Sequence, residues 1–144
     1  ELELPVIKKN FNSLRKILAE ENCFPDSSRP FVTVIPGARW ETKKWPPAFF
    51  ADVLNRINQR FPAAVFLLAG AASDKDTCVQ IKDLTPNASA FVLAGRTGMG
   101  ELLELMRLSS ATLTNDSGPM HIAAALKTPV FALFGPKSPE MTGQ

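Results

Sequence analysis

The stretch that decides the fold runs from Thr114 to Leu126 and reads TNDSGPMHIAAAL. An apolar run at 111–113 leads into it and predicts a buried strand, and a polar turn then gives way to an alanine-rich helix. Pro119 suits the first position of a helix, where its missing N–H costs nothing and its fixed φ already fits. The residues before it, Asp-Ser-Gly, are types that commonly precede a helix start. The stretch therefore predicts a strand, a turn and a helix in direct succession.

The first turn of this helix is a candidate anion site. It leaves the backbone N–H groups of Gly118, Met120 and His121 without intrahelical partners, and the positive end of the helix dipole lies there too. In open α/β sheets, ligands bind at the carboxyl ends of the strands, so a phosphate is the expected guest. Two plainer interpretations stay open, because Asp-Ser-Gly-Pro is also an ordinary helix cap and a histidine near a helix start is often only a surface residue.

Apolar runs and helical patterns alternate along the rest of the chain. The expected strands are 31–35, 64–69, 90–93, 111–113 and 130–134, and the expected helices are 8–21, one opened by Trp45-Pro46-Pro47, 74–84, 100–108 and 119–126. The second helix should carry Phe49 and Phe50 on the same buried side. Short strands that are apolar throughout, alternating with helices, predict an α/β fold, a Rossmann-like parallel sheet with helices on both faces. We expect a linker and leading helix at 1–30 and one Rossmann-like domain at 31–144.

Composition narrows the classes of function. The chain has 144 residues, of which 45% are hydrophobic and 21% charged, which is ordinary for one globular domain. A net charge of +2 is too small to indicate a nucleic-acid partner, and none is expected. The longest nearly apolar run, 63–72, is too short to span a membrane. Cys23 and Cys78 match no metal-ligand spacing and are expected as free thiols. Because the chain starts at Glu1 and ends after the last strand in an open loop, we expect part of a longer protein, truncated at its C-terminus.

Four loops that follow strands should meet at one edge of the sheet: 37–44, 70–76, 95–98 and 115–121. Together they offer helix-end donors, an arginine and the adjacent Lys43 and Lys44. That combination suits a nucleotide diphosphate, with backbone amides and a lysine on the phosphates. On local sequence alone, a merely solvated loop is the more ordinary interpretation of the two lysines. Neither the G-x-G-x-x-G fingerprint nor a G-x-x-x-x-G-K-[ST] loop is present.

Three further patterns have ordinary structural explanations. Asp74-Lys75-Asp76 has the D-x-D spacing of some metal-dependent sugar transferases, but it falls where a helix needs a cap. Ser117 and His121 have no third residue that would orient them as nucleophile and base. Trp45 is expected to pack, as a hydrophobic staple on the helix that follows it.

A series of segments resembles a known family. In order along the chain they are Pro36-Gly37-Ala38, Lys43-Lys44-Trp45-Pro46, Leu67-Leu68-Ala69-Gly70, Asn115 to Ala125, and Leu133-Phe134-Gly135-Pro136. The series resembles the C-terminal domain of the heptosyltransferases of glycosyltransferase family 9, from about Phe31 to Gly143. The most specific part is the D-[ST]-G-x-x-H-x-A-A-[AL] segment, and the K-x-W-P element adds independent weight.

The resemblance implies the C-terminal half of a GT-B two-domain glycosyltransferase. Residues 31–144 would then bind a nucleotide-sugar donor, ADP-heptose or a similar compound, as substrate, with no cofactor and no metal. An N-terminal acceptor domain of the same protein would hold the lipopolysaccharide core and supply the catalytic base. The reaction implied is inverting and metal-independent, in the cytoplasm at the inner face of the inner membrane. This chain alone would contain no catalytic residue and transfer no sugar.

The resemblance also implies roles for single residues. Lys43 would contact the donor phosphates, and Asp116 would lie near the sugar. The amides of Ser117 and Gly118 and the ring of His121 would surround the diphosphate. Thr97 and its neighbours would border the base. These residues together make up the donor site that the resemblance implies. Two alternatives stay open: a nucleotide-binding or interaction module without transferase activity, and a nucleotide-sugar epimerase domain.

Overall fold

A computed structural model describes residues 8–21, 29–37, 45–114 and 130–132. In chain order its elements are α1 (Lys8–Glu20), β1 (Phe31–Ile35), α2 (Pro47–Arg60), β2 (Val65–Leu68), the short 3₁₀ turn η2 (Ala72–Asp74), α3 (Lys75–Asp83), β3 (Ser89–Val92), α4 (Met99–Leu108), β4 (Ala111–Thr114) and β5 (Val130–Ala132). These bounds agree with the predicted strands and helices to within one or two residues wherever both are described. The helix expected at 119–126 lies outside the described residues.

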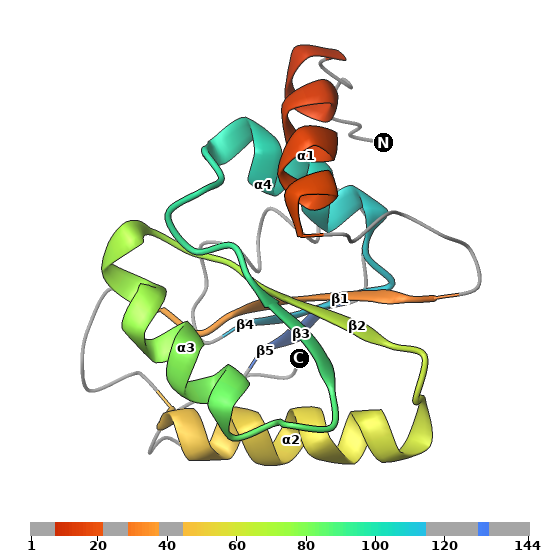
Figure 1. The fold of residues 1–144 in the computed structure, drawn as a ribbon, viewed down its shortest axis with the longest axis vertical. Coiled ribbons are helices and arrows are strands. Elements are labelled where there is room, and N and C mark those ends of the chain that lie inside the picture. Colours follow the sequence, from red (N-terminus) through yellow and green to blue (C-terminus); the bar gives the residue numbers. More distant parts are fainter. Residues whose placement is uncertain (1–7, 22–28, 38–44, 115–129, 133–144) are drawn as a thin grey trace.

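The five strands form one parallel sheet in the order β3-β2-β1-β4-β5 (Figure 1). This confirms the predicted Rossmann-like α/β fold. From β1 the chain winds outward through β2 to β3, whereas β4 returns to the other side of β1 and β5 follows it. The direction of winding therefore reverses between β1, the central strand, and its neighbour β4.

Helices cover both faces of the sheet, and each face has its own apolar core. Because side chains alternate along a strand, Phe31 and Ile35 of β1 point to one face, and Val32 and Val34 point to the other. The first face packs against α1 and α4, and the second against α2 and α3, as Figure 1 shows. The fully buried helix residues in these cores are Leu14, Leu18, Leu105, Met106, Phe50, Leu54, Cys78 and Ile81. The leading helix α1 thus shares a core with β1, while the domain boundary at residue 31 stays a prediction.

The start of α2 confirms one detail and corrects another. Trp45 precedes the cap residue Pro46, and its ring meets Phe50 edge-on with centroids 6.4 Å apart, which is the expected staple. Phe49, predicted on the buried side with Phe50, is instead 55% exposed, whereas Phe50 is completely buried. Consecutive helical residues are about 100° apart, so only one of two adjacent phenylalanines faces the sheet. Phe49 instead meets the Trp45 ring edge-on, at 5.7 Å between centroids.

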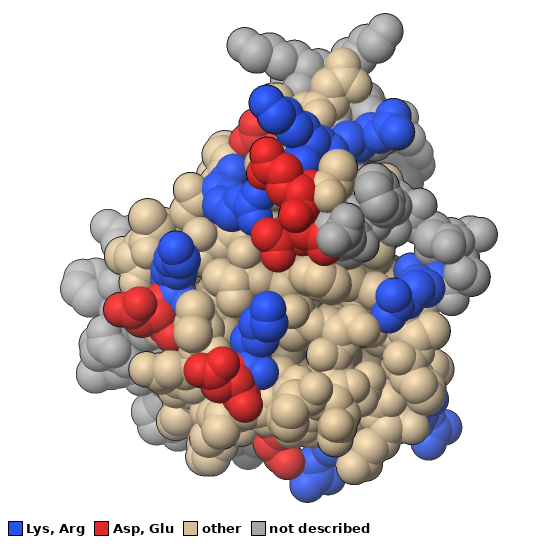
Figure 2. Space-filling model, viewed as in Figure 1, with Lys and Arg blue, Asp and Glu red and all other residues tan. Residues whose placement is uncertain are grey.

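Charged side chains of both signs are interspersed on the face shown in Figure 2, and several gather beside α1. No helix within the described ranges is both long and apolar enough to cross a bilayer. One acidic residue departs from this surface pattern, because Glu104 of α4 is only 6% exposed. Its carboxylate lies 3.7 Å from Arg107, one turn further along the same helix, which offsets part of the cost of burying its charge.

Candidate donor-binding edge

The centre of the site is the point where β1 and β4 end side by side. In the sheet register Ile35, the last residue of β1, is paired with Thr114, the last residue of β4. The strand that follows β1 in the chain, β2, lies beyond β1 in the sheet, whereas the strand that follows β4, β5, lies beyond β4 in the opposite direction. In doubly wound sheets this reversal opens a crevice outside the carboxyl ends of the strands, where ligands bind. The described residues therefore identify the β1/β4 edge as the candidate site.

Both loops that carry most of the predicted site residues start at this edge. The segment with Lys43 begins two residues after Ile35, and the segment with Asp116, Ser117, Gly118 and His121 begins directly after Thr114. All five of these predicted residues lie outside the described residues, so their roles stay predictions. What the structure fixes is the pairing of the strand ends from which the two segments leave.

Next to this point, Asp74 joins the loops that follow β1 and β2. Its Oδ2 accepts a hydrogen bond from the N–H of Ala71 at 3.1 Å. Its carboxylate also lies against Gly37, where an added Cβ would come within 2.5 Å of Oδ2, and against Gly70, where the same atom would be 2.8 Å away. Glycines at both positions thus make room for one carboxylate. Asp74 is the N-cap residue of α3 by position, but the predicted side-chain cap is absent there, because the carboxylate closes the 3₁₀ turn η2 instead.

A buried thiol lies one helical turn beyond Asp74. Cys78 is fully buried and unpaired. Burial first, and then the negative charge of Asp74, raise the pKa of this thiol to about 12. The thiol therefore stays protonated at neutral pH, and Cys78 is a free thiol as predicted. In the ranges that the structure describes, no group of three or more His, Cys, Asp or Glu side chains could hold a metal ion.

Thr97 is the one predicted site residue that the structure describes. It lies in the loop between β3 and α4, which is partly exposed and follows the carboxyl end of its strand. Gly95 donates its N–H to the carbonyl of Gly70 at 2.9 Å, so this loop is bonded to the loop after β2. Gly95 has a φ of +82° and packs on Ala72, where a Cβ would come within 3.0 Å of the neighbouring Cα. Both features favour glycine and hold the loop close to its neighbour.

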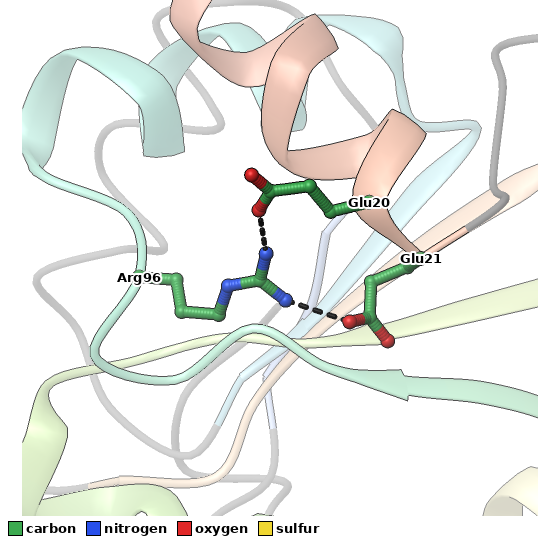
Figure 3. A network of polar contacts seen from close by, with 3 residues as sticks. All are labelled: Glu20, Glu21 and Arg96. Atoms are coloured by element: carbon green, nitrogen blue, oxygen red, sulfur yellow. Dashed lines mark hydrogen bonds and ion pairs between the residues drawn. The ribbon is translucent and has the colours of Figure 1, made fainter.

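Arg96 precedes Thr97 in one of the four loops expected to meet at the edge. Its guanidinium donates to Glu21 at 2.8 Å and to Glu20, both at the end of α1 (Figure 3). Two carboxylates already surround this cation, so it is not available for a phosphate in this arrangement. Sequence reasoning missed this contact because the partners are 75 and 76 residues apart and carry no local motif.

The parallel sheet with its reversal at β1 and β4 defines the class of Rossmann-like α/β domains. The sequence profile of Glycosyltransferase family 9 (heptosyltransferase) matches residues 1–144, and the chain belongs to this family. Lipooligosaccharide heptosyltransferase 2 of Haemophilus influenzae is 37% identical over 119 residues, which cover 79% of this chain and 34% of that protein. The chain thus spans about a third of that relative's length.

Solved structures agree with this assignment. The structure of Escherichia coli ADP-heptose LPS heptosyltransferase II is similar with a TM-score of 0.74 and 29% identity, over 97% of this chain and 41% of that one. A UDP-GlcNAc 2-epimerase from Neisseria meningitidis has a TM-score of 0.66 at 13% identity, over 88% of this chain and 32% of that one. The second likeness shows a shared fold alone. The family is therefore established, and the epimerase alternative gains nothing from it.

Proposed function

We propose that this chain binds the nucleotide-sugar donor of a heptosyltransferase, ADP-heptose or a similar compound, whose sugar is transferred to the lipopolysaccharide core. The observation that carries the proposal is the register of Ile35 with Thr114. It brings together the starting points of the Lys43 segment and of the segment that holds Asp116 and His121. A cation and a helix N-terminus that meet at one sheet edge are well suited to a diphosphate.

The residues of the proposed site divide between the diphosphate and the sugar. Lys43 and the helix-end amides of Ser117 and Gly118 bind the diphosphate, with the ring of His121 beside it. Asp116 lies near the sugar. These donors stabilise the negative charge that develops on the departing nucleoside diphosphate as the glycosidic bond to it breaks, so transfer needs no metal. The N-terminal acceptor domain supplies the base that takes the proton from the acceptor hydroxyl, and the reaction proceeds in the cytoplasm.

An ADP titration followed by NMR tests the donor site directly. The helix-end amides and a lysine together contribute about 4–6 kcal/mol, which corresponds to a dissociation constant between about 1 mM and ~50 µM. The backbone amide signals of Gly118, Met120 and His121 should shift as ADP is added. If these amides stay unchanged at millimolar ADP, the donor-site assignment is wrong.

A lysine variant separates phosphate binding from base binding. Lys43→Ala should weaken ADP binding by about tenfold and leave adenosine binding nearly unchanged, because adenosine has no phosphate for the lysine to contact. Lys82→Ala removes an exposed lysine at the far end of α3 and is the matched control, with no expected change for either ligand. Equal losses for ADP and adenosine would exclude Lys43 from the phosphate role.

A further inference from the structure

The contact between α1 and the loop before α4 joins two parts of the chain that the sequence separates by 75 residues. Arg96 Nη1 lies 2.8 Å from Glu21 Oε2, and Nη2 donates to Glu20 Oε1 (Figure 3). The Arg96 side chain is 32% exposed, and those of Glu20 and Glu21 are 54% and 30% exposed. One planar guanidinium therefore bridges two carboxylates in a partly shielded position, where it has a defined geometry. We call these three side chains the Arg96 bridge.

The bridge does little for the attachment of α1, because apolar contacts already hold that helix. Leu14 and Leu18 are completely buried against the sheet and α4. Two adjacent carboxylates at the carboxyl end of a helix repel each other and the helix dipole, and a cation offsets this cost. An arginine from any nearby element could offset this repulsion. In this chain the arginine comes from the loop Gly95–Gly98, so the ion pairs also connect that loop to α1.

This loop depends on polar contacts for its shape. At its ends Gly95 donates its N–H to Gly70, and Gly98 donates its N–H to the carboxylate of Glu101 at 2.6 Å. The residue that follows the loop, Met99, is 62% exposed, so apolar burial does not anchor this side. In the middle of the loop the Arg96 N–H donates to the Leu93 carbonyl at 2.9 Å and closes a turn, and the Arg96 side chain ties this turn to α1. The adjacent Thr97 is partly exposed, and its hydroxyl makes no hydrogen bond to another described residue.

We propose that Arg96 is a positioning residue for the donor site: through Glu20 and Glu21 it holds the loop Gly95–Gly98 so that Thr97 borders the nucleoside part of the donor. It acts through the loop and does not touch the phosphates, because its guanidinium is committed to α1. Holding a binding loop in its bound shape before the ligand arrives lowers the entropic cost of binding. That Thr97 borders the base is implied by the family resemblance and belongs to the proposed donor site, so this inference rests on the proposed function.

Calorimetry with adenosine and with ADP tests the proposal in this chain. Arg96→Ala should weaken both ligands by the same factor, about three- to tenfold. The pair Glu20→Gln with Glu21→Gln keeps the shape of both side chains, and it should produce a similar loss although neither residue lies in the binding loop. Because all three residues act as one unit, adding Arg96→Ala to that pair should cause no further loss. Arg96→Lys, which keeps the cation, should recover part of the affinity.

A control and a structural readout keep the outcomes distinct. Arg56→Ala is the matched control. Arg56 on α2 forms an ion pair with Asp52 at 3.0 Å, away from the loop Gly95–Gly98, so this substitution should change the affinity for neither adenosine nor ADP. In the glutamine pair the amide signals of Thr97 and Gly98 should also move without added ligand, at an unchanged melting temperature. A loss for ADP alone would make Arg96 a phosphate ligand and overturn the proposal, as would unchanged affinities in all variants. If the unaltered chain bound neither ligand, the proposed function itself would fail.

Discussion

Gly37→Ala is a sensitive probe of how the candidate site is built. The three heavy atoms nearest to an added Cβ all belong to the Asp74 carboxyl group, at 2.5 to 2.7 Å. Because real Cβ atoms do not approach so closely, the carboxylate must move, and its hydrogen bond to the Ala71 N–H is lost or stretched. Overpacking of this kind costs about 1–3 kcal/mol, and a hydrogen bond to a charged group contributes about 1.5–3 kcal/mol, less where it is partly exposed. We expect a loss of about 2 kcal/mol in the free energy of unfolding.

A double-mutant cycle measured by urea unfolding shows whether Asp74 is the cause. Asp74→Ala alone should cost about 1 kcal/mol, and in that background Gly37→Ala should cost almost nothing, because the obstructing atoms are gone. Gly70→Ala is the matched contrast, since it also meets Asp74 but has a φ of +148°. Removing Asp74 does not relieve that backbone strain, so Gly70→Ala should remain destabilising in both backgrounds. Additive costs for Gly37→Ala and Asp74→Ala would refute the packing described here.

Two further predictions concern the core. Phe50→Ala should cost about 3–5 kcal/mol in urea unfolding and Phe49→Ala less than about 1 kcal/mol, because these neighbours on α2 are 0% and 55% exposed; similar costs would contradict the orientation of the helix. The Cys78 thiol should resist alkylation in the folded chain at pH 8 and react once urea unfolds it. Since folding raises its pKa from 9.0 to about 12, the folded state gains stability from the protonated thiol below about pH 9 and loses it as the pH rises toward about 12. Cys78→Ala should remove that part of the pH dependence.

The sheet was predictable because its signals are local. Runs such as 31–35 and 64–69 are apolar throughout, which only a strand covered on both faces tolerates, and each is flanked by a helical pattern. Chain connectivity then restricts the topology to right-handed crossovers. The start of α2 was predictable for the same reason, since Trp45 lies at a fixed offset from the residue on which it packs. Phe49 was misjudged because two adjacent aromatic residues give a helix no unique buried side.

The contacts that shape the candidate edge were not predictable, because they join loops that are distant in sequence. The position of Asp74 against Gly37 depends on how the loops after β1 and β2 converge. The Arg96 bridge depends on where α1 crosses α4. Both charged residues look like ordinary surface residues in the sequence. Of the predicted site, only Thr97 lies among the described residues, so Lys43, Asp116, Ser117, Gly118 and His121 stay predictions.

Apolar contacts hold the sheet and its helices together, whereas polar contacts hold the loops at its carboxyl edge. We expect the first kind to determine stability and the second to determine ligand affinity. The body of the sheet is held by apolar burial on both faces, whereas the loops at its carboxyl edge are held to one another by polar groups: Asp74 between the first two, the Gly95 N–H between the second and third, and Arg96 between the third and α1. Apolar burial scales with area and tolerates no large cavity, while partly exposed polar contacts each contribute little energy but fix direction. Substitutions in the core should therefore lower stability at nearly constant ligand affinity of the folded fraction. Substitutions in the polar contacts should change affinity with a smaller loss of stability, which makes the edge adjustable without rebuilding the sheet.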